Sequence, residues 1–454
     1  MKRKLFFALG VAILIEIAPS FFSLEPTSSL NLHFLQKMSC HDYQINRRRV
    51  LKTFSASLLG MPISQLLANT APGKAQAEHV VLFWNSGGMS HLDTWDPKPG
   101  RKVQGEFNPI KTSVDGMEIS EIFPQLAKQM HHGALIRSIA GTNGDHGRAQ
   151  YELQTGFNQS PNIMHPGLGS LVVHERKPLG DLPALVSISG QSARAGYLGQ
   201  QCEAYFVGRP GQKDPYLAFP EGISHARGMQ RLQILEQMNA RTSGEKGAKE
   251  LKATETALKD AVNLMESPAL KAFELEDEDP KTVAKYGDTE FGRGALLARR
   301  LVEKGVRFVQ VNRGGFDNHG NIFEAMRNHG AAMDPAIASL LSDLKANGML
   351  SKTLVVVLSE FGRTPRINDG GGRDHWARCF SAMMAGGGIK GGSIIGASDE
   401  DGMEVAERPV KVADLHATIC HALGISLDKE LITPQGRPMR LIPKGATPIH
   451  ELFA

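Results

Sequence analysis

The feature that most constrains the fold is a series of short apolar runs set between segments of helical periodicity. The six runs cover residues 80–84, 134–139, 184–189, 306–311, 353–358 and 380–385. Amphipathic segments that end at Gly305 and Gly348 lead directly into the fourth and fifth runs. This order of helix and strand is typical of βαβ units. We therefore predict a three-layer α/β/α protein with a mostly parallel sheet.

Composition excludes several classes of protein. The chain has 454 residues, 41% of them hydrophobic, which is ample for a large buried core. Its first 77 residues hold nine Lys and Arg against three acids, so the remainder carries 42 basic and 44 acidic residues. A body without excess positive charge argues against a nucleic-acid partner. The four Cys form no CxxC pair, which argues against a disulfide framework or a cysteine-rich zinc site.

Residues 1–77 are interpreted as a targeting leader. The sequence NRRRVLK at residues 46–52 precedes a mildly apolar stretch and AQA, and resembles a twin-arginine export signal that ends at Ala77. Met38 opens a conventional length for that signal, so residues 1–37 are interpreted as a start-site artefact. The alternatives are a secretory signal in the first 15 residues or a chance basic cluster. We expect a periplasmic or extracellular protein without a membrane span in its mature form.

The mature domain is predicted to cover residues 78–454, and its composition and sequence pattern change between about residues 210 and 286. That segment is charged, rich in Ala and Leu, and helical in pattern. It suggests a helical insertion over the sheet. A pair of solvated surface helices is an equally good interpretation of the same pattern.

Polar clusters follow four of the six apolar runs. They contain Ser90, His91, Asp93 and Asp96; Asp145, His146 and Arg148; Asp317 and His319; and Glu360, Arg363, Arg366, Asp374 and His375. The carboxyl ends of parallel strands share one edge of a sheet, where ligands bind in open α/β folds. Mixed carboxylate and imidazole donors suit Zn²⁺ or Mn²⁺, and arginines in the same loops could hold an oxyanion. His329 and His416 lie in helical sequence and are interpreted as structural.

These motifs resemble a known family. The segments GGMSHLDTWDPKP, DHGRAQYELQTG, HPGLGSLV, SEFGRTPRIN and GGRDHW, from about His79 to Leu423, resemble DUF1501, a family of exported bacterial proteins related to alkaline phosphatases and sulfatases. The resemblance implies an alkaline-phosphatase-like fold and a site with one or two divalent metal ions, Zn or Mn. It also implies that the substrate is a small-molecule or polysaccharide ester.

The resemblance assigns roles to individual residues. Asp317 and His319 resemble the ligand pair of one metal, Glu360 stands at the place of a strand-end ligand, and His375 resembles a later metal-binding His, with Asp374 beside it. Asp93 is a possible further ligand. Ser90 is the candidate nucleophile, with direct attack by water as an equally good alternative. Arg363 is the candidate to stabilise charge on the transferring group.

Two positions depart from the superfamily pattern. Asn85 stands where a metal-binding Asp is usual, and Phe361 stands where a His is usual. These departures leave open a one-metal site, an altered two-metal site or a degenerate one. The sequence therefore predicts an exported metal-dependent hydrolase of phosphate or sulfate esters. The alternative is a binding or accessory protein of the cell surface that keeps the fold without catalysis.

Overall fold

A nine-stranded sheet forms the centre of the computed structural model, which describes residues 75–212, 222–242 and 261–453. The strand order is β12-β4-β11-β8-β1-β7-β5-β6, and β15 also pairs with β4. The strands span His79–Asn85 (β1), Gly133–Ala140 (β4), Leu185–Ile188 (β5), Tyr205–Val207 (β6), Phe308–Arg313 (β7), Thr353–Leu358 (β8), Phe380–Ala385 (β11), Ser393–Ile395 (β12) and Val410–Lys411 (β15). All neighbours run parallel except β11, which is antiparallel to β4 and β8. The predicted α/β fold with a mostly parallel sheet is confirmed.

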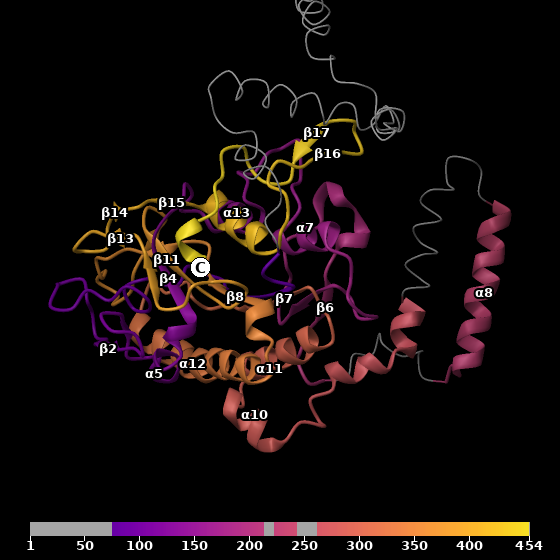
Figure 1. The fold of residues 1–454 in the computed structure, drawn as a ribbon, viewed down its shortest axis with the longest axis horizontal. Helices are drawn as coiled ribbons and strands as arrows, with labels where there is room; N and C mark the ends of the chain where they lie inside the picture. Colours follow the sequence, from indigo (N-terminus) through magenta and orange to yellow (C-terminus); the bar gives the residue numbers. More distant parts are fainter. Residues whose placement is uncertain (1–74, 213–221, 243–260, 454) are drawn as a thin grey trace, which may run out of the picture. The chain divides into compact units, whose positions relative to one another are not determined.

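Helices cover both faces of the sheet (Figure 1). One layer contains α5 (Pro124–Ala127), α10 (Pro280–Tyr286), α11 (Glu290–Glu303) and α12 (Ile322–Ala346); the other contains α6 (His146–Thr155), α7 (Leu168–Glu175) and α13 (Val412–Ala422). Strand β1 contributes side chains to the hydrophobic cores on both faces of the sheet. Val81 and Phe83 belong to the first hydrophobic core, and Leu82 belongs to the second. Because β1 is buried on both faces, its sequence is a continuous apolar run instead of an alternating one.

The remaining elements are short or peripheral. They are β2 (Pro109–Lys111) with β3 (Glu118–Ser120), β9 (Gly362–Arg363) with β10 (His375–Trp376), β13 (Ala397–Ser398) with β14 (Val405–Glu407), β16 (Glu430–Ile432) with β17 (Pro438–Arg440), and the helix α8 (His225–Thr242). Helices α8 and α10 lie in the segment that the sequence predicts to be a helical insertion. The predicted leader, residues 1–77, lies almost wholly outside the described residues.

The antiparallel strand β11 decides where the site residues collect. Strand β8 ends at Leu358, and β11 begins at Phe380, with Met383 of β11 opposite Val357 of β8. The chain therefore leaves β8 and returns to the sheet at the same edge. Between the two strands, β9 and β10 pair with each other and set His375 opposite Arg363. The carboxyl ends of β1, β4 and β7 lie at this edge too, so four loops meet there.

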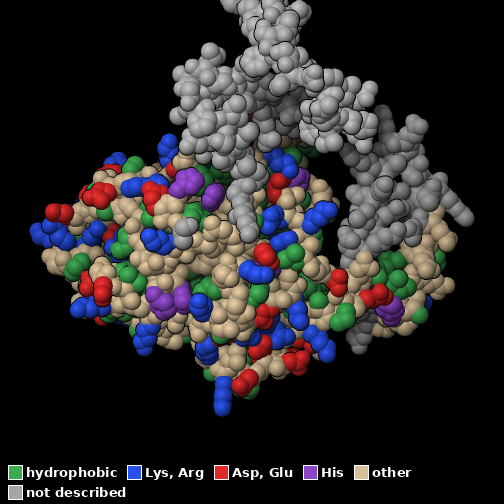
Figure 2. Space-filling model, viewed as in Figure 1, with side chains coloured by type: hydrophobic (Ala, Val, Ile, Leu, Met, Phe, Trp, Pro, Cys, Tyr) green, Lys and Arg blue, Asp and Glu red, His purple; other side chains and the backbone are tan. Residues whose placement is uncertain are grey.

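The surface of the described residues is mixed in charge. Figure 2 shows acidic and basic side chains interspersed on the viewed face. Within the described residues, none of the helices has both the length and the apolar character needed to cross a membrane.

Candidate metal centre

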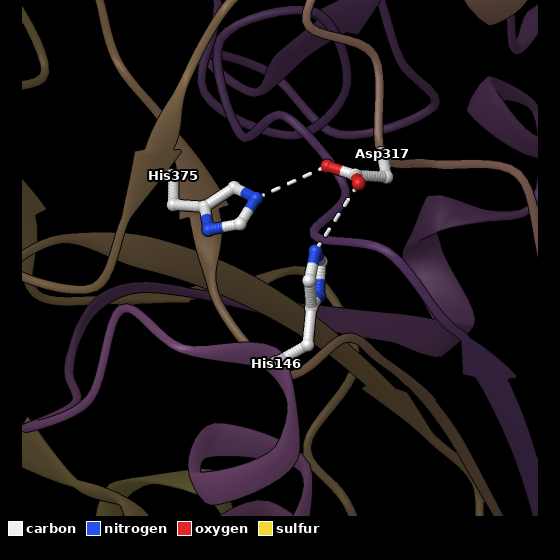
Figure 3. Close-up of side chains that lie close together, drawn as sticks. All are labelled: His146, Asp317 and His375. Atoms are coloured by element: carbon white, nitrogen blue, oxygen red, sulfur yellow. Dashed lines mark hydrogen bonds and ion pairs between the residues drawn. The ribbon is translucent and has the colours of Figure 1, made fainter.

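Three side chains, each from the segment that follows a different strand, meet at the carboxyl edge of the sheet (Figure 3). His146 is the first residue of α6, Asp317 lies between β7 and α12, and His375 lies in β10. His146 Nε2 is 3.3 Å from Asp317 Oδ2, and His375 Nε2 is 3.1 Å from Asp317 Oδ1. These donor atoms all lie within 4.8 Å of one another, which is close enough to share one metal ion.

A third imidazole completes the cluster. His319 Nε2 lies 3.0 Å from Asp317 Oδ1 and 3.0 Å from His375 Nε2. The loop after β7 thus contributes both Asp317 and His319, as the sequence predicts for its ligand pair. We call His146, Asp317, His319 and His375 the His₃Asp cluster.

The other nitrogen of each ring is already engaged. The Nδ1 partners are Glu360 Oε1 for His146 at 3.0 Å, the Gly144 carbonyl for His375 at 2.8 Å, and Asp374 Oδ1 for His319 at 2.7 Å. A carbonyl or an ionised carboxylate can only accept a hydrogen bond, so each Nδ1 must carry the proton. In the neutral rings, every Nε2 therefore presents a lone pair to the cluster. Metal-binding histidines are commonly held by outer partners in this way.

Four acceptor groups facing one another need a cation. Three Nε2 lone pairs and the Asp317 carboxylate would repel if nothing lay between them. The Nε2 atom of His146 is buried and has no hydrogen-bond partner among the described residues, because its 3.3 Å approach to Asp317 does not form a bond. A buried polar atom without a partner is costly and calls for an explanation. The donor set of the His₃Asp cluster therefore fits a divalent transition metal.

Glu360 lies behind His146 instead of beside the other ligands. Its side chain is 2% exposed, and Oε1 accepts hydrogen bonds from His146 Nδ1 and from the backbone N–H of Gly87, the latter at 2.7 Å. Asp374 stands in the same relation to His319, whose contact lowers the pKa of the Asp374 carboxyl group. The structure thus gives these two predicted ligands the geometry of outer partners that orient imidazoles.

Arg363 anchors Asp317 from inside the protein. Its side chain is fully buried, and Nη2 donates to Asp317 Oδ1 at 2.6 Å. Burial raises the pKa of Asp317, but the hydrogen bond and the positive charge of Arg363 lower it more, so Asp317 stays ionised. The other donors of Arg363 bond the backbone carbonyls of Gly87, Gly88 and Arg373. Arg363 is therefore enclosed, which argues against the predicted contact with the transferring group of a substrate.

Ser90 and Asp93 form a buried network of their own. Ser90 is 1% exposed and donates to Asp93 Oδ2 at 2.5 Å. Both oxygens of Asp93 also meet the Arg373 guanidinium, at 2.8 and 3.3 Å, and neither side chain of that pair is exposed. A hydroxyl enclosed in this way cannot reach a substrate, and a carboxylate paired with Arg373 has no free charge for a metal. The geometry argues against the nucleophile role of Ser90 and the ligand role of Asp93.

Two apolar or neutral side chains occupy the positions that depart from the superfamily pattern. Asn85 is fully buried, and its Nδ2 lies 3.5 Å from the Leu358 carbonyl. Phe361 is fully buried too. Its ring centroid lies 5.0 Å from that of His146 and 4.7 Å from that of His375. Neither side chain offers an ionised donor. The described residues thus provide a donor set for one ion at this edge.

His146 is the member of the cluster that the sequence assignment of ligands misses. The signal is present in the sequence, because DHG at residues 145–147 follows the apolar run 134–139 and forms part of one of the four strand-end clusters. Asp145 caps α6 by accepting from the Arg148 N–H at 3.1 Å, which fixes His146 as the first helical residue. What the sequence does not reveal is that Glu360 lies behind this imidazole.

The sequence matches a known family over most of its length. The family model described as "Protein of unknown function (DUF1501)" matches residues 77–453. No curated protein matches the sequence. Among solved structures, the chain is similar to Ps i-CgsB, with 12% identity, coverage of 78% of this chain and 73% of that chain, and a TM-score of 0.38. It is also similar to a protein of the alkaline phosphatase superfamily from Vibrio parahaemolyticus, with 10% identity, coverage of 78% and 68%, and a TM-score of 0.36.

A third similar structure is the C-terminal periplasmic domain of EcEptC from Escherichia coli, in complex with Zn. Its identity is 10%, the coverage is 84% of this chain and 96% of that chain, and the TM-score is 0.37.

Proposed function

The chain belongs to the DUF1501 family, and we propose that this member is a metal-dependent hydrolase of phosphate or sulfate esters. The observation that carries the proposal is the convergence of His146, Asp317 and His375, whose donor atoms lie within 4.8 Å of one another at the carboxyl edge of the sheet. His319 Nε2 adds a further donor 3.0 Å from Asp317 and from His375. Ligands of open α/β folds bind at that edge. A donor set of three imidazoles and one carboxylate suits Zn²⁺ best, with Mn²⁺ next.

Each residue of the centre has a definite task in this proposal. The His₃Asp cluster would hold one ion. Its positive charge would polarise an ester oxygen and lower the pKa of a bound water molecule. Glu360, the Gly144 carbonyl and Asp374 keep the imidazole protons on Nδ1. Arg363 fixes the orientation of Asp317. Because Ser90 is enclosed, we assign the attacking group to water, one of the two routes that the sequence leaves open.

The surroundings of the cluster favour an anionic substrate. Helix α6 begins at His146, so the partly positive end of its dipole lies at the cluster. Arg148 lies in the first turn of α6 and Arg366 in the segment between β9 and β10, and both are exposed. An exposed guanidinium at either position is available to a phosphate or sulfate group, whereas the buried Arg363 is not.

The test combines metal content with a substrate screen. Purified protein is stripped with a chelator, reloaded with Zn²⁺, Mn²⁺ or Mg²⁺, and offered an aryl phosphate, a phosphodiester and an aryl sulfate. We expect about one equivalent of bound metal and turnover of one ester class that depends on it. Protein that binds no metal and turns over none of the esters would instead support the accessory, non-catalytic alternative.

A change behind the cluster should weaken metal binding without unfolding the protein. Glu360→Gln keeps the size of the side chain but removes the charge that holds the His146 proton. We expect metal affinity to fall by about 10- to 100-fold, measured by titration of the stripped protein. The matched control is Glu106→Gln at an exposed ion pair with Arg327, where affinity should equal that of the wild type. Equal affinity in both variants would refute the role assigned to Glu360.

We also propose that the protein is exported through the twin-arginine route from a start at Met38. Replacing Arg47 and Arg48 by Lys should leave the protein in the cytoplasm, because that route reads the arginine pair of NRRRVLK. Cell fractionation followed by immunoblotting measures the outcome. Deletion of residues 1–37 is the control and should leave export intact, whereas loss of export on that deletion would favour the first apolar segment as the signal.

A further inference from the structure

The loop that carries Asp317 contains two consecutive glycines, which can adopt more backbone conformations than other residues. It leaves β7 as Arg313-Gly314-Gly315-Phe316, and Gly315 has a φ of +92°, a conformation that favours glycine. A ligand on such a loop needs external supports to keep its carboxylate in one place. One support comes from the loop after β1, where the Ser86 carbonyl accepts from the Phe316 N–H at 3.2 Å. The chain passes so close to Gly87 that a Cβ there would lie 2.5 Å from the Asp317 nitrogen.

The second support is His329, on the second turn of α12. Its ring is 7% exposed and lies parallel to the Phe316 ring, with 3.8 Å between centroids and an angle of 14°. Nε2 is 2.9 Å from the Gly315 carbonyl, and Nδ1 is 2.9 Å from Arg313 Nε. One imidazole thus contacts three of the four residues that lead to Asp317.

Only one form of the imidazole satisfies these contacts. The Arg313 Nε–H can only donate, so Nδ1 of His329 must offer a lone pair. The Gly315 carbonyl can only accept, so Nε2 must carry the proton. Burial lowers the pKa of His329 to about 4, and nearby Arg313 acts in the same direction, so the ring stays neutral near pH 7. The ring is therefore a fixed donor and acceptor, and not a titrating group, under ordinary conditions.

We propose that His329 is a positioning residue that locks the Arg313–Phe316 segment and thereby sets the Asp317 carboxylate for metal binding. The inference rests on the proposed function, because it assigns Asp317 to the metal. It replaces the interpretation of His329 as merely structural. A neutral imidazole suits this task because it ties a side chain at the end of β7 to a backbone carbonyl two residues later. Without it, the side-chain donor left to the Gly315 carbonyl among the described residues would be Asn318, 3.1 Å away in the same loop, and α12 would no longer be tied to that loop there.

The test compares two variants at this position in the full chain. His329→Phe keeps an aromatic ring for stacking but loses both hydrogen bonds, whereas His329→Gln keeps an amide that can donate and accept. We expect His329→Phe to weaken Zn²⁺ binding by about tenfold or more, as loss of an outer support commonly does, and His329→Gln to restore part of that loss. Hydrogen exchange of the backbone amides of residues 314–317, measured by mass spectrometry, should become faster in His329→Phe.

A control on the same helix separates positioning from general stability. Ser339→Ala removes a partly buried hydrogen bond from α12 to the Lys285 carbonyl, away from the Asp317 loop. It should lower the Tm but leave Zn²⁺ affinity and the exchange of residues 314–317 unchanged. If His329→Phe behaves like Ser339→Ala, the proposal is overturned. A wild type that binds no Zn²⁺ would refute the proposed function, while the exchange rates would still decide whether His329 holds the loop.

Discussion

Asp317→Asn is expected to abolish metal binding and to lower ester turnover by roughly a hundredfold or more, as loss of a metal ligand would. Asp317 is the single carboxylate of the His₃Asp cluster and contacts all three imidazoles. The Asn side chain has the same size, so packing is preserved. It brings no negative charge, and its amide nitrogen would face a lone pair or Arg363 on one side. The change therefore removes the charge that the cation needs. It also takes the countercharge from the buried Arg363, so some loss of stability is expected beside the loss of metal.

The measurement is metal content and turnover, beside circular dichroism to establish that the variant is folded. The matched control is Asp115→Asn, an exposed Asp in the turn between β2 and β3. This control should retain the metal content and rate of the wild type. Full metal content with full activity in Asp317→Asn would show that the His₃Asp cluster is not the reactive site.

The large strands were predictable because a strand that is buried on both faces has a continuous apolar sequence. The run predicted at residues 353–358 is β8, and that at 380–385 is β11. A parallel strand in the middle of a sheet needs apolar side chains on each face, so its sequence stands out from the polar loops. The direction of β11 was not predictable, because an isolated strand sequence carries no sign of its orientation. Short strands such as β12 and β15 hold too few residues to form a pattern.

The site was predictable only as a location. Strand ends indicate where side chains meet, and the structure brings Asp317, His319 and His375 together there. The sequence cannot separate a carboxylate that faces the cluster from one that lies behind an imidazole, because both are the same residue type. Glu360 and Asp374 show this, since each accepts from an Nδ1 atom.

Long-range pairing also hides the surroundings of predicted site residues. Ser90 and Asp93 look like a nucleophile and a ligand because a Gly-rich loop at a strand end suggests exposure. In the structure, Asp93 pairs with Arg373, 280 positions further along the chain, and both side chains are fully buried. Nothing near residue 93 in the sequence indicates this partner. A measurement of stability as well as of activity is therefore needed to distinguish a structural role of Asp93 from a role as a metal ligand.

Arg373→Met is expected to cost about 3–5 kcal/mol of unfolding free energy, the range for a buried ion pair that loses one partner. It would leave the Asp93 carboxylate fully buried, with Ser90 as its remaining side-chain hydrogen-bond donor. Arg373 also donates to the carbonyls of Val103 at 2.8 Å, Thr364 at 3.2 Å and Pro365, so its loss frees three further backbone acceptors. Urea unfolding measures the change.

The comparison with an exposed pair identifies the cause. Arg378→Met removes a pair with Glu404 that is more than half exposed on both sides, and it should change stability by no more than about 0.5 kcal/mol. The double variant Arg373→Met/Asp93→Leu should recover part of the loss, because replacing both partners of a buried pair by apolar groups removes the stranded charge. A cost below about 1 kcal/mol for Arg373→Met would contradict the buried charge pair. Asp93 would then regain its candidacy as a metal ligand.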